Sequence, residues 1–297
     1  MGDDKTGIGV AYDPAALDEL ERRYWRDIWD TAVYDAVEDY RIDLARFGPV
    51  QAGIVPAEPE EPMLNLVLGA GIPGAVEAGH LSDALKWAES HGVDFRVPVT
   101  PGRPAAGLAE RWLMERGLEQ GGSWAKFVRD ASPPAFAQPP GIEVFDRGAP
   151  NEDDGFADPL AESLGMPYWG ATFFFDLPGT EGWCCYVAAA GDDPLAYVAM
   201  LVHGEVAQLL FAPAPGARAK RAGDGQAAVL RRCIEDAAAA GCSAIFAETK
   251  EPEPKRPSAS RLHLLRAGFA QAFTRPEWRP PRHAVAEAGS RGLWWGD

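Results

Sequence analysis

The chain has 297 residues, of which 46% are hydrophobic and 24% are charged, as expected for a folded globular protein. Its length exceeds that of a usual single domain, so two domains of roughly 140 to 150 residues are expected. The formal net charge of -16 would repel a nucleic-acid backbone and an anionic membrane surface. Both partners are therefore excluded, and a neutral or cationic small molecule is favoured.

The cysteines and the start of the sequence carry no sign of a metal, a disulfide framework or export. No C-x-x-C pair and no nearby pair of histidines is present, so the four cysteines are expected to be buried apolar residues in a reducing compartment. Residues 1–7 contain no apolar signal segment, and no stretch reaches about 18 apolar residues. A cytoplasmic protein without a metal is predicted. The cysteines are Cys184, Cys185, Cys233 and Cys242.

The first half of the sequence alternates helical and strand-like segments. An apolar stripe formed by Leu17, Leu20, Tyr24 and Ile28 has helical spacing. In chain order, the patterns predict a helix over 14–47, a strand over 63–68, a helix over 75–91, a strand over 94–99, a helix over 105–117 and a strand over 124–129.

A dinucleotide-binding fingerprint is one interpretation of the segment Gly69-Ala-Gly-Ile-Pro-Gly74. It matches G-x-G-x-x-G after an apolar strand, and Asp94 follows at the spacing of a ribose-binding acid. Pro73 stands where the helix should begin, however, and too few further βα units remain for a doubly wound sheet. A loop is the favoured interpretation, and an NAD(P)-dependent oxidoreductase remains a remote alternative.

The clearest boundary is the segment 132–141, which carries four prolines in ten residues. Such a composition favours an extended linker and excludes a helix. The predicted domains are therefore 1–131 and 142–297, joined by this linker.

The second half predicts more strands than the first. In chain order we expect a strand over 142–145, a helix from 151 to about 164, an aromatic segment over 168–175, and strands over 183–190 and 195–202 joined by a hairpin turn at 191–194. A buried strand over 206–211, a helix over 227–240, a strand over 243–248, a helix over 258–267 and a last strand to Arg275 follow.

A basic glycine-rich loop, Lys220-Arg-Ala-Gly-Asp-Gly-Gln226, is predicted between the strand over 206–211 and the helix over 227–240. A helix that begins with small residues can direct unpaired backbone N–H groups at an anion. The segment therefore predicts a phosphate-binding loop, although an ordinary turn has the same appearance.

The residues 140–281 resemble the GNAT superfamily of acyl-CoA-dependent N-acyltransferases. Lys220-x-x-Gly223-x-Gly225 is similar to the family's Q/R-x-x-G-x-G/A motif, and Gly268-Phe269 ends a late helix as in that family. Further similarity to a bacterial subgroup lies in 179–183, 240–242, 248–249 and 273–278. The first half is expected to be a degenerate domain of the same type.

The resemblance implies a site for acetyl-CoA. Backbone groups of the strand would hold the pantetheine arm, and the glycine segment would hold the pyrophosphate. An amine would then attack the acetyl carbonyl directly, without a metal or a covalent enzyme intermediate. The cosubstrate-binding residues implied in this way are Leu210, Phe211, Ala212, Arg218, Lys220, Arg221, Ala222, Gly223, Asp224, Gly225 and Gln226.

The acceptor site is predicted from carboxylate, imidazole and aromatic residues. Glu248 ends an apolar strand and could hold an amine or relay its proton, or it could simply pair with Lys250. His263 could act as an acid, contact CoA or have a structural role. Tyr168, Trp169 and Phe173 could form a wall of the acceptor pocket or belong to the core.

Three residues depart from the family pattern. Asp224 places an acidic side chain beside the expected pyrophosphate. Gln208 stands where the family often has a general base, and Leu264 where it often has a tyrosine acid. An alternative function is therefore an acyl-CoA-binding or interaction module with weak catalysis.

Together these patterns predict an α/β protein of two GNAT-like domains, each a mixed, mostly antiparallel sheet flanked by helices. The predicted function is N-acetyl transfer from acetyl-CoA to a small-molecule amine, with the first domain shaping the acceptor site. A monomer or homodimer is expected.

Overall fold

The computed structural model of the chain describes residues 10, 12–32, 42–59, 63–148, 155–250 and 259–281. It divides into two compact units, each of which is formed by two separate segments of the sequence. Unit 1 comprises Met1–Val33 with Ala125–Phe273, and unit 2 comprises Tyr34–Trp124 with Thr274–Asp297. This division differs from the predicted one, because the proline-rich segment 132–141 lies inside unit 1.

Unit 1 is built on a mixed sheet with the strand order β11-β5-β10-β9-β8-β7-β6. Each of the strands β6, β7, β8 and β9 is antiparallel to its neighbour in this series, whereas β10 is parallel to β9. The predicted hairpin turn at 191–194 is confirmed, with Gly191 at φ 63°. The strands are β5 (Glu119–Arg129), β6 (Glu143–Asp146), β7 (Trp183–Ala190), β8 (Asp193–His203), β9 (Val206–Pro213), β10 (Ala244–Lys250) and β11 (Ala270–Arg279).

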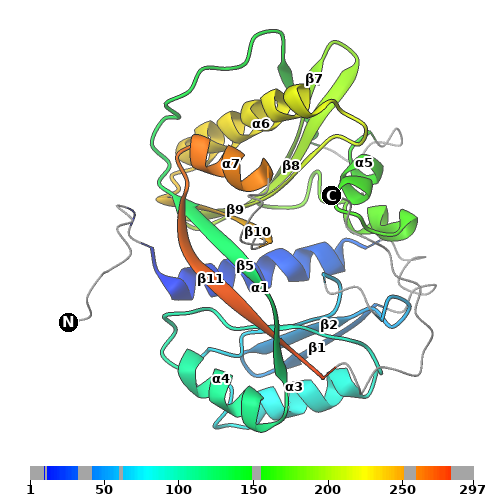
Figure 1. Cartoon of the computed structure of the whole chain (residues 1–297), viewed down its shortest axis with the longest axis vertical. Helices are drawn as coiled ribbons and strands as arrows, with labels where there is room; N and C mark the ends of the chain where they lie inside the picture. Colours follow the sequence, from blue (N-terminus) through cyan, green and yellow to red (C-terminus); the bar gives the residue numbers. More distant parts are fainter. Residues whose placement is uncertain are drawn as a thin grey trace. The chain divides into compact units, whose positions relative to one another are not determined.

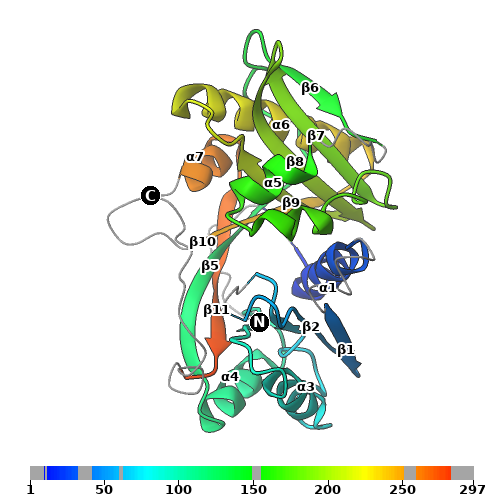
Figure 2. The same cartoon turned by 90° about the vertical axis from the view of Figure 1, so that its right-hand side faces the viewer.

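Helices cover both faces of the unit 1 sheet. The long helix α6 (Ala219–Ala239) packs on β7, β8 and β9, with α7 (Ala259–Arg266) beside it (Figure 1). On the opposite face lie α5 (Ala157–Ser163) and α1 (Pro14–Asp30); Figure 2 shows α5 in front of the strands and α6 behind them. Because side chains alternate along a strand, each strand packs against the helices on both faces of the sheet.

Helix α1 follows from local sequence signals. The carboxylate of Asp13 accepts a hydrogen bond from the Ala15 N–H at 2.8 Å, and Pro14 occupies the first helical position, as is usual at helix starts. The predicted apolar stripe is fully buried. The helix ends at Asp30, however, and the strand β1 (Asp43–Phe47) follows after residues 33–41, which lie outside the described part.

The prediction of helix up to residue 47 is therefore wrong, and the strand β2 (Val50–Ile54) was missed. Gly48 adopts φ 55°, a left-handed conformation that suits a tight turn, and β1 pairs with β2 on either side of it. Gly48-Pro49 was the signal of this hairpin, because such a pair interrupts a helix.

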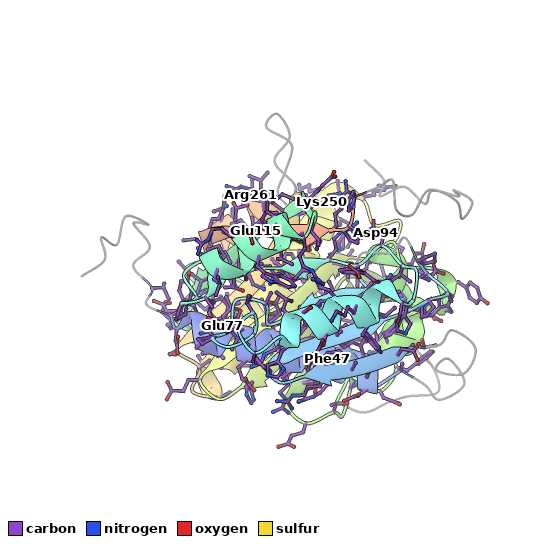
Figure 3. The ribbon with its side chains drawn as sticks, turned by 90° about the horizontal axis from the view of Figure 1, so that it is seen from below. Phe47, Glu77, Asp94, Glu115, Lys250 and Arg261 are labelled. Atoms are coloured by element: carbon purple, nitrogen blue, oxygen red, sulfur yellow. The ribbon has the colours of Figure 1, made fainter. Side chains whose placement is uncertain are left out.

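Unit 2 has the same kind of organisation on a smaller scale. Its strands β1, β2 and β3 (Leu66–Leu68) are antiparallel, β3 bridges Arg96 in parallel beside β4, and β4 (Val97–Pro98) pairs with the end of β11. Helix α3 (His80–Glu89) packs on β1, β2 and β3 (Figure 3, where Phe47 marks the end of β1), and α4 (Ala106–Glu115) contributes to the same core.

The two halves of the chain repeat one order of elements: three antiparallel strands, a helix, a strand parallel to the third, a second helix and a long strand. The long last strand of each half contributes residues to both units. β5 supplies Glu119–Trp124 to unit 2 and Ala125–Arg129 to unit 1, and β11 is divided in the same way after Phe273. The first half of the sequence thus completes the sheet of unit 1.

The dinucleotide fingerprint is not supported by the fold. Gly69–Gly74 forms a series of turns, and α3 begins only at His80 after Gly79. Asp94, the expected ribose-binding acid, pairs with Arg96. The mostly antiparallel sheet of unit 2 is not the parallel, doubly wound sheet that the motif requires.

Candidate active site

The parallel strands β9 and β10 of unit 1 stop pairing with one another before either strand ends. The register of β9 and β10 begins at Val206 with Ala244 and ends at Leu209 with Ala247. Both strands continue beyond this point, β9 to Pro213 and β10 to Lys250. The backbone of residues 210–212, predicted to bind pantetheine, therefore lies in a stretch of β9 that is not paired with β10.

The predicted glycine loop is instead the first part of a helix. Helix α6 begins at Ala219, so Lys220–Gln226 lies within its first turns, and the Ala222 N–H already bonds to the Arg218 carbonyl at 2.9 Å. The N–H groups without an i−4 partner are thus those of residues 219–221. The anion-binding end of the helix lies at Ala219–Arg221, about one turn before the predicted position.

The glycines of the motif serve close packing. A Cβ at Gly225 would lie 2.5 Å from the Leu195 Cβ and 3.0 Å from its carbonyl carbon, so only glycine lets α6 approach β8 this closely. A Cβ at Gly223 would lie 2.9 Å from the His263 ring of α7. Ala222, Gly225 and Gln226 are buried, which places them against the protein interior.

Substituting Gly225 with alanine is expected to destabilise the protein by about 1–3 kcal/mol through overpacking, despite the better helix propensity of alanine. Thermal and urea unfolding followed by circular dichroism would measure the loss. Gly107→Ala is the matched control: Gly107 also lies in a helix, but its added Cβ meets only the Arg111 guanidinium at 3.6 Å. That variant should be as stable as the parent or more stable. Equal stability of both variants would refute the packing role of Gly225.

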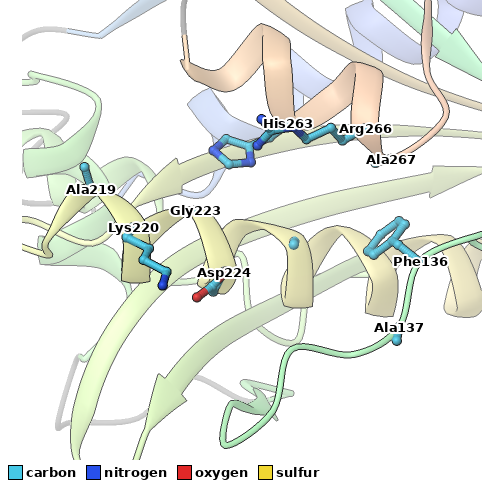
Figure 4. Close-up of a pocket in the computed structure, with 10 residues that line it drawn as sticks. Phe136, Ala137, Ala219, Lys220, Gly223, Asp224, His263, Arg266 and Ala267 are labelled. Carbon is cyan, nitrogen blue, oxygen red and sulfur yellow. The ribbon is translucent and has the colours of Figure 1, made fainter.

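A cavity of about 480 Å³ lies along the first turns of α6, between this helix, α7 and the proline-rich segment (Figure 4). Its volume is in the range of small-molecule sites. Lys220 and Arg266 provide two cationic side chains, and Asp224 provides one carboxylate. The lining residues are Phe136, Ala137, Ala219, Lys220, Gly223, Asp224, Ala227, His263, Arg266 and Ala267.

His263 lies in this cavity against Gly223. Burial lowers the pKa of His263, the neighbouring Arg266 lowers it further, and Asp224 partly offsets both effects. The imidazole is therefore neutral at pH 7, and the cationic lining comes from Lys220 and Arg266. Of the roles predicted for His263, contact with a ligand in the cavity is therefore favoured over that of an acid.

Glu248 lies where β10 separates from β9, as the first residue after the last paired one. Its predicted partner Lys250 is exposed, and its observed partner is Lys126 of β5, whose Nζ lies 3.0 Å from the Glu248 Oε2. Lys126 also contacts the Glu21 Oε1 of α1 at 3.4 Å. The structure thus brings together three charged side chains from three elements. We call this set, Glu21, Lys126 and Glu248, the buried ion cluster.

Two members of the cluster, Glu21 and Lys126, were not predicted from the sequence. Glu21 interrupts the apolar stripe of α1, and Lys126 lies within the apolar segment 124–128 of β5; both are buried. A charged residue at a position where the pattern predicts a buried apolar one is rare, unless the charge is paired. That was the available signal, but its partners could be found only from the fold.

Two of the residues that depart from the family pattern, Leu264 and Gln208, are buried. Leu264 is fully buried in the core between α6 and α7 and cannot donate a proton. Gln208 is 1% exposed, and its Oε1 has no hydrogen-bond partner in the described structure. An unpaired buried carbonyl oxygen costs about 1–3 kcal/mol, so Gln208 is not explained by stability alone.

The three aromatic residues predicted to line the acceptor pocket differ in their exposure to solvent. Tyr168–Phe173 forms a 3-10 helix in which Trp169 and Phe173 are buried and contact one another at 5.7 Å between ring centroids. Tyr168 is 88% exposed. Only Tyr168 is accessible to a ligand at the surface of unit 1, whereas the other two belong to the core.

Neither a metal centre nor a membrane span is found in the described part of the chain. None of the described helices is sufficiently long and apolar to cross a bilayer. Across the same residues, no three His, Cys, Asp or Glu side chains are grouped so that they could hold a metal ion.

No family model and no curated protein matches the sequence. Solved structures do match. A GCN5-related N-acetyltransferase from Kribbella flavida aligns at a TM-score of 0.59 and 11% identity, covering 90% of this chain and 95% of that chain. Another from Sphaerobacter thermophilus aligns at 0.51 and 14%, covering 92% and 94%. A tandem GNAT protein from the clavulanic acid biosynthesis pathway aligns at 0.52 and 13%, covering 89% and 95%.

These likenesses extend over nearly the whole chain and concern its fold, that of a two-unit α/β protein. The chain has the GNAT fold, and the predicted fold class is confirmed.

Proposed function

We propose that the protein is an N-acetyltransferase that moves an acetyl group from acetyl-CoA to the primary amine of a small molecule. The observation that carries this proposal is the opening between β9 and β10, with Glu248 at its first unpaired position and the start of α6 nearby in sequence. Unpaired strand backbone can hydrogen-bond the amide groups of pantetheine. The GNAT fold supports acyl transfer in general.

The phosphate end of the cosubstrate is assigned to the start of α6 and to the cavity beside it. The N–H groups of Ala219–Arg221 and the helix dipole favour the pyrophosphate. Lys220 and Arg266 add positive charge to the adjoining cavity, and His263 offers a neutral ring. Asp224 lowers the affinity for phosphate, although the two cations outnumber it.

The transfer itself needs no covalent enzyme intermediate. The acceptor nitrogen attacks the acetyl carbonyl carbon, a C–N bond forms, and the C–S bond breaks to release CoA. Glu248 takes the proton of the amine, directly or through water, and backbone N–H groups of residues 210–212 stabilise the developing oxyanion. The leaving thiolate takes its proton from solvent, because Leu264 offers none. Tyr168 and the net charge of -16 favour a neutral or cationic acceptor.

Calorimetric titration with acetyl-CoA tests the cosubstrate assignment. Saturable binding is expected, and NAD(P) should not compete. Lys220→Ala and Arg266→Ala should each weaken binding about 3- to 10-fold, by the loss of one charge-assisted contact. Lys86→Ala, an exposed lysine of α3 that pairs with Asp83, is the matched control and should bind as the parent does. Absence of binding would overturn the proposal.

Thiol release from acetyl-CoA with a panel of primary amines tests the reaction. Polyamines, aminoglycosides and amino acids represent the cationic and zwitterionic classes of acceptor. Turnover with at least one amine is expected. Tight binding without any release of thiol would instead support the alternative of an acyl-CoA-binding module, which the buried Gln208 and Leu264 favour.

A further inference from the structure

The buried ion cluster places an ammonium group where an apolar side chain would be less costly. Lys126 is 1% exposed, and its neighbours on β5, Ala125 and Phe127, are fully buried in the core on the α6 face. Removing an ammonium from water is expensive unless it is paired and hydrogen-bonded. The two carboxylates that pair with it come from different elements, α1 and β10, so the pairing exists only in the folded unit.

The members of the cluster differ in their access to solvent. The side chain of Glu21 is 5% exposed and that of Glu248 is 18% exposed. Glu248 is therefore the member at the accessible end, and it is also the member at the opening of the β9–β10 pair. Lys126 contacts its Oε2 from the protein interior and fixes the position of that carboxylate.

Two other polar side chains near the cluster, those of Tyr24 and Gln208, do not replace Glu248 as a proton acceptor. Tyr24 lies one turn after Glu21 on α1, and burial raises its pKa well above the ordinary value, with further contributions from Glu248, Glu21 and Cys185. The phenol is therefore protonated at neutral pH. Gln208 lies on β9 opposite Phe246 of β10, and its amide does not titrate.

We propose that Lys126 is a positioning residue for the reaction: paired with Glu21 on one side, it holds the Glu248 carboxylate at the acyl-transfer site on the other. This inference rests on the proposed function in assigning the proton of the amine to Glu248. Lys126 acts through Glu248 and does not contact the substrate. The first half of the sequence thereby supplies two of the three charges that define the site.

The geometry predicts different effects for two substitutions of Lys126. Lys126→Met removes the ammonium that contacts the Glu248 Oε2 at 3.0 Å, so the carboxylate loses the group that fixes its position. Lys126→Arg keeps a cationic donor for the same carboxylate. Loss of a positioning residue should lower kcat at unchanged acetyl-CoA affinity, and the conservative variant should restore kcat.

The experiment compares the parent, Lys126→Met, Lys126→Arg, Glu21→Gln and the control Lys250→Met, an exposed lysine on the same strand as Glu248. The kcat and the KM for the acceptor amine are measured for each by thiol release at saturating acetyl-CoA. Acetyl-CoA binding and thermal unfolding are measured in parallel.

Lys126→Met is expected to lower kcat about 100-fold, with acetyl-CoA affinity unchanged. Glu21→Gln should lower kcat less than Lys126→Met does, Lys126→Arg should retain most of the activity, and Lys250→Met should match the parent. If Lys126→Met does not fold, Glu21→Gln, which removes the second partner of Lys126, still decides the matter. Parental kcat in the folded variant would overturn the inference. Absence of turnover in the parent would overturn the proposed function, and this outcome is distinct from turnover that does not depend on Lys126.

Discussion

Replacing Glu248 with glutamine is expected to reduce kcat about 10²- to 10⁴-fold, which is the usual contribution of a general base. Glutamine keeps the shape of the side chain but cannot accept a proton at neutral pH. The acetyl-CoA dissociation constant should change little, since the assigned phosphate contacts come from α6 and α7. Thiol release at saturating acetyl-CoA measures the first quantity, and calorimetry measures the second.

The same substitution also removes one of the two carboxylates that face Lys126. Lys126 keeps the Glu21 contact at 3.4 Å, so the variant should fold with a lower midpoint of thermal unfolding. Glu235→Gln provides the matched control, because that glutamate forms an exposed helical ion pair with Arg231, and it should leave kcat unchanged. If Glu248→Gln turned over as fast as the parent, proton removal would have to be assigned elsewhere.

Expression of residues 132–297 alone is expected to give a protein that does not fold. This fragment lacks α1 and β5, so the place between β10 and β11 in the sheet of unit 1 would be empty. Loss of a buried aromatic side chain alone typically costs about 3–5 kcal/mol, and the fragment loses the buried Phe127 together with the apolar face of α1. The free energy of unfolding of a native protein is about 5–15 kcal/mol, so the combined losses should leave the fragment unfolded.

Circular dichroism, size-exclusion chromatography and one-dimensional NMR would test the fragment. Co-expression with residues 1–131 should restore a folded, acetyl-CoA-binding complex, because the missing helix and strand are then supplied by a second chain. A cooperative unfolding transition and parent-like acetyl-CoA affinity for 132–297 alone would show that the second half is self-sufficient, as the predicted domain boundary implied.

The fold class could be predicted because its signals are local. Strand-like periods, the hairpin turn at Gly191 and the late Gly268-Phe269 all lie within short stretches of sequence, and the structure contains the corresponding elements. The glycine motif follows β9 as predicted, but it lies inside α6 instead of before it. The packing role of Gly225 was not predicted, because sequence does not show that Gly225 faces Leu195 at a distance that only a hydrogen atom can occupy.

The candidate site was predictable only in part. Glu248 stands out at the end of an apolar strand, but its partner comes from a strand more than a hundred positions earlier in the chain. The composition of segment 132–141 suggested a domain boundary, and nothing local shows that the strand before it belongs to the same unit as the strands after it. Such long-range pairings depend on topology, which a single sequence does not specify.

The division of β5 and β11 between the units has a consequence for synthesis of the protein on the ribosome. Unit 2 begins with residues made early, yet β4 pairs with Glu277 and Trp278 of β11, which are made after all of unit 1. Unit 1 in turn contains α1, which is made before the other described elements and packs on a strand made much later. Contacts so distant in sequence slow folding and prolong the exposure of apolar surface. Neither unit can complete its sheet before β11 has been made, so the nascent chain should depend on chaperones until that strand is available.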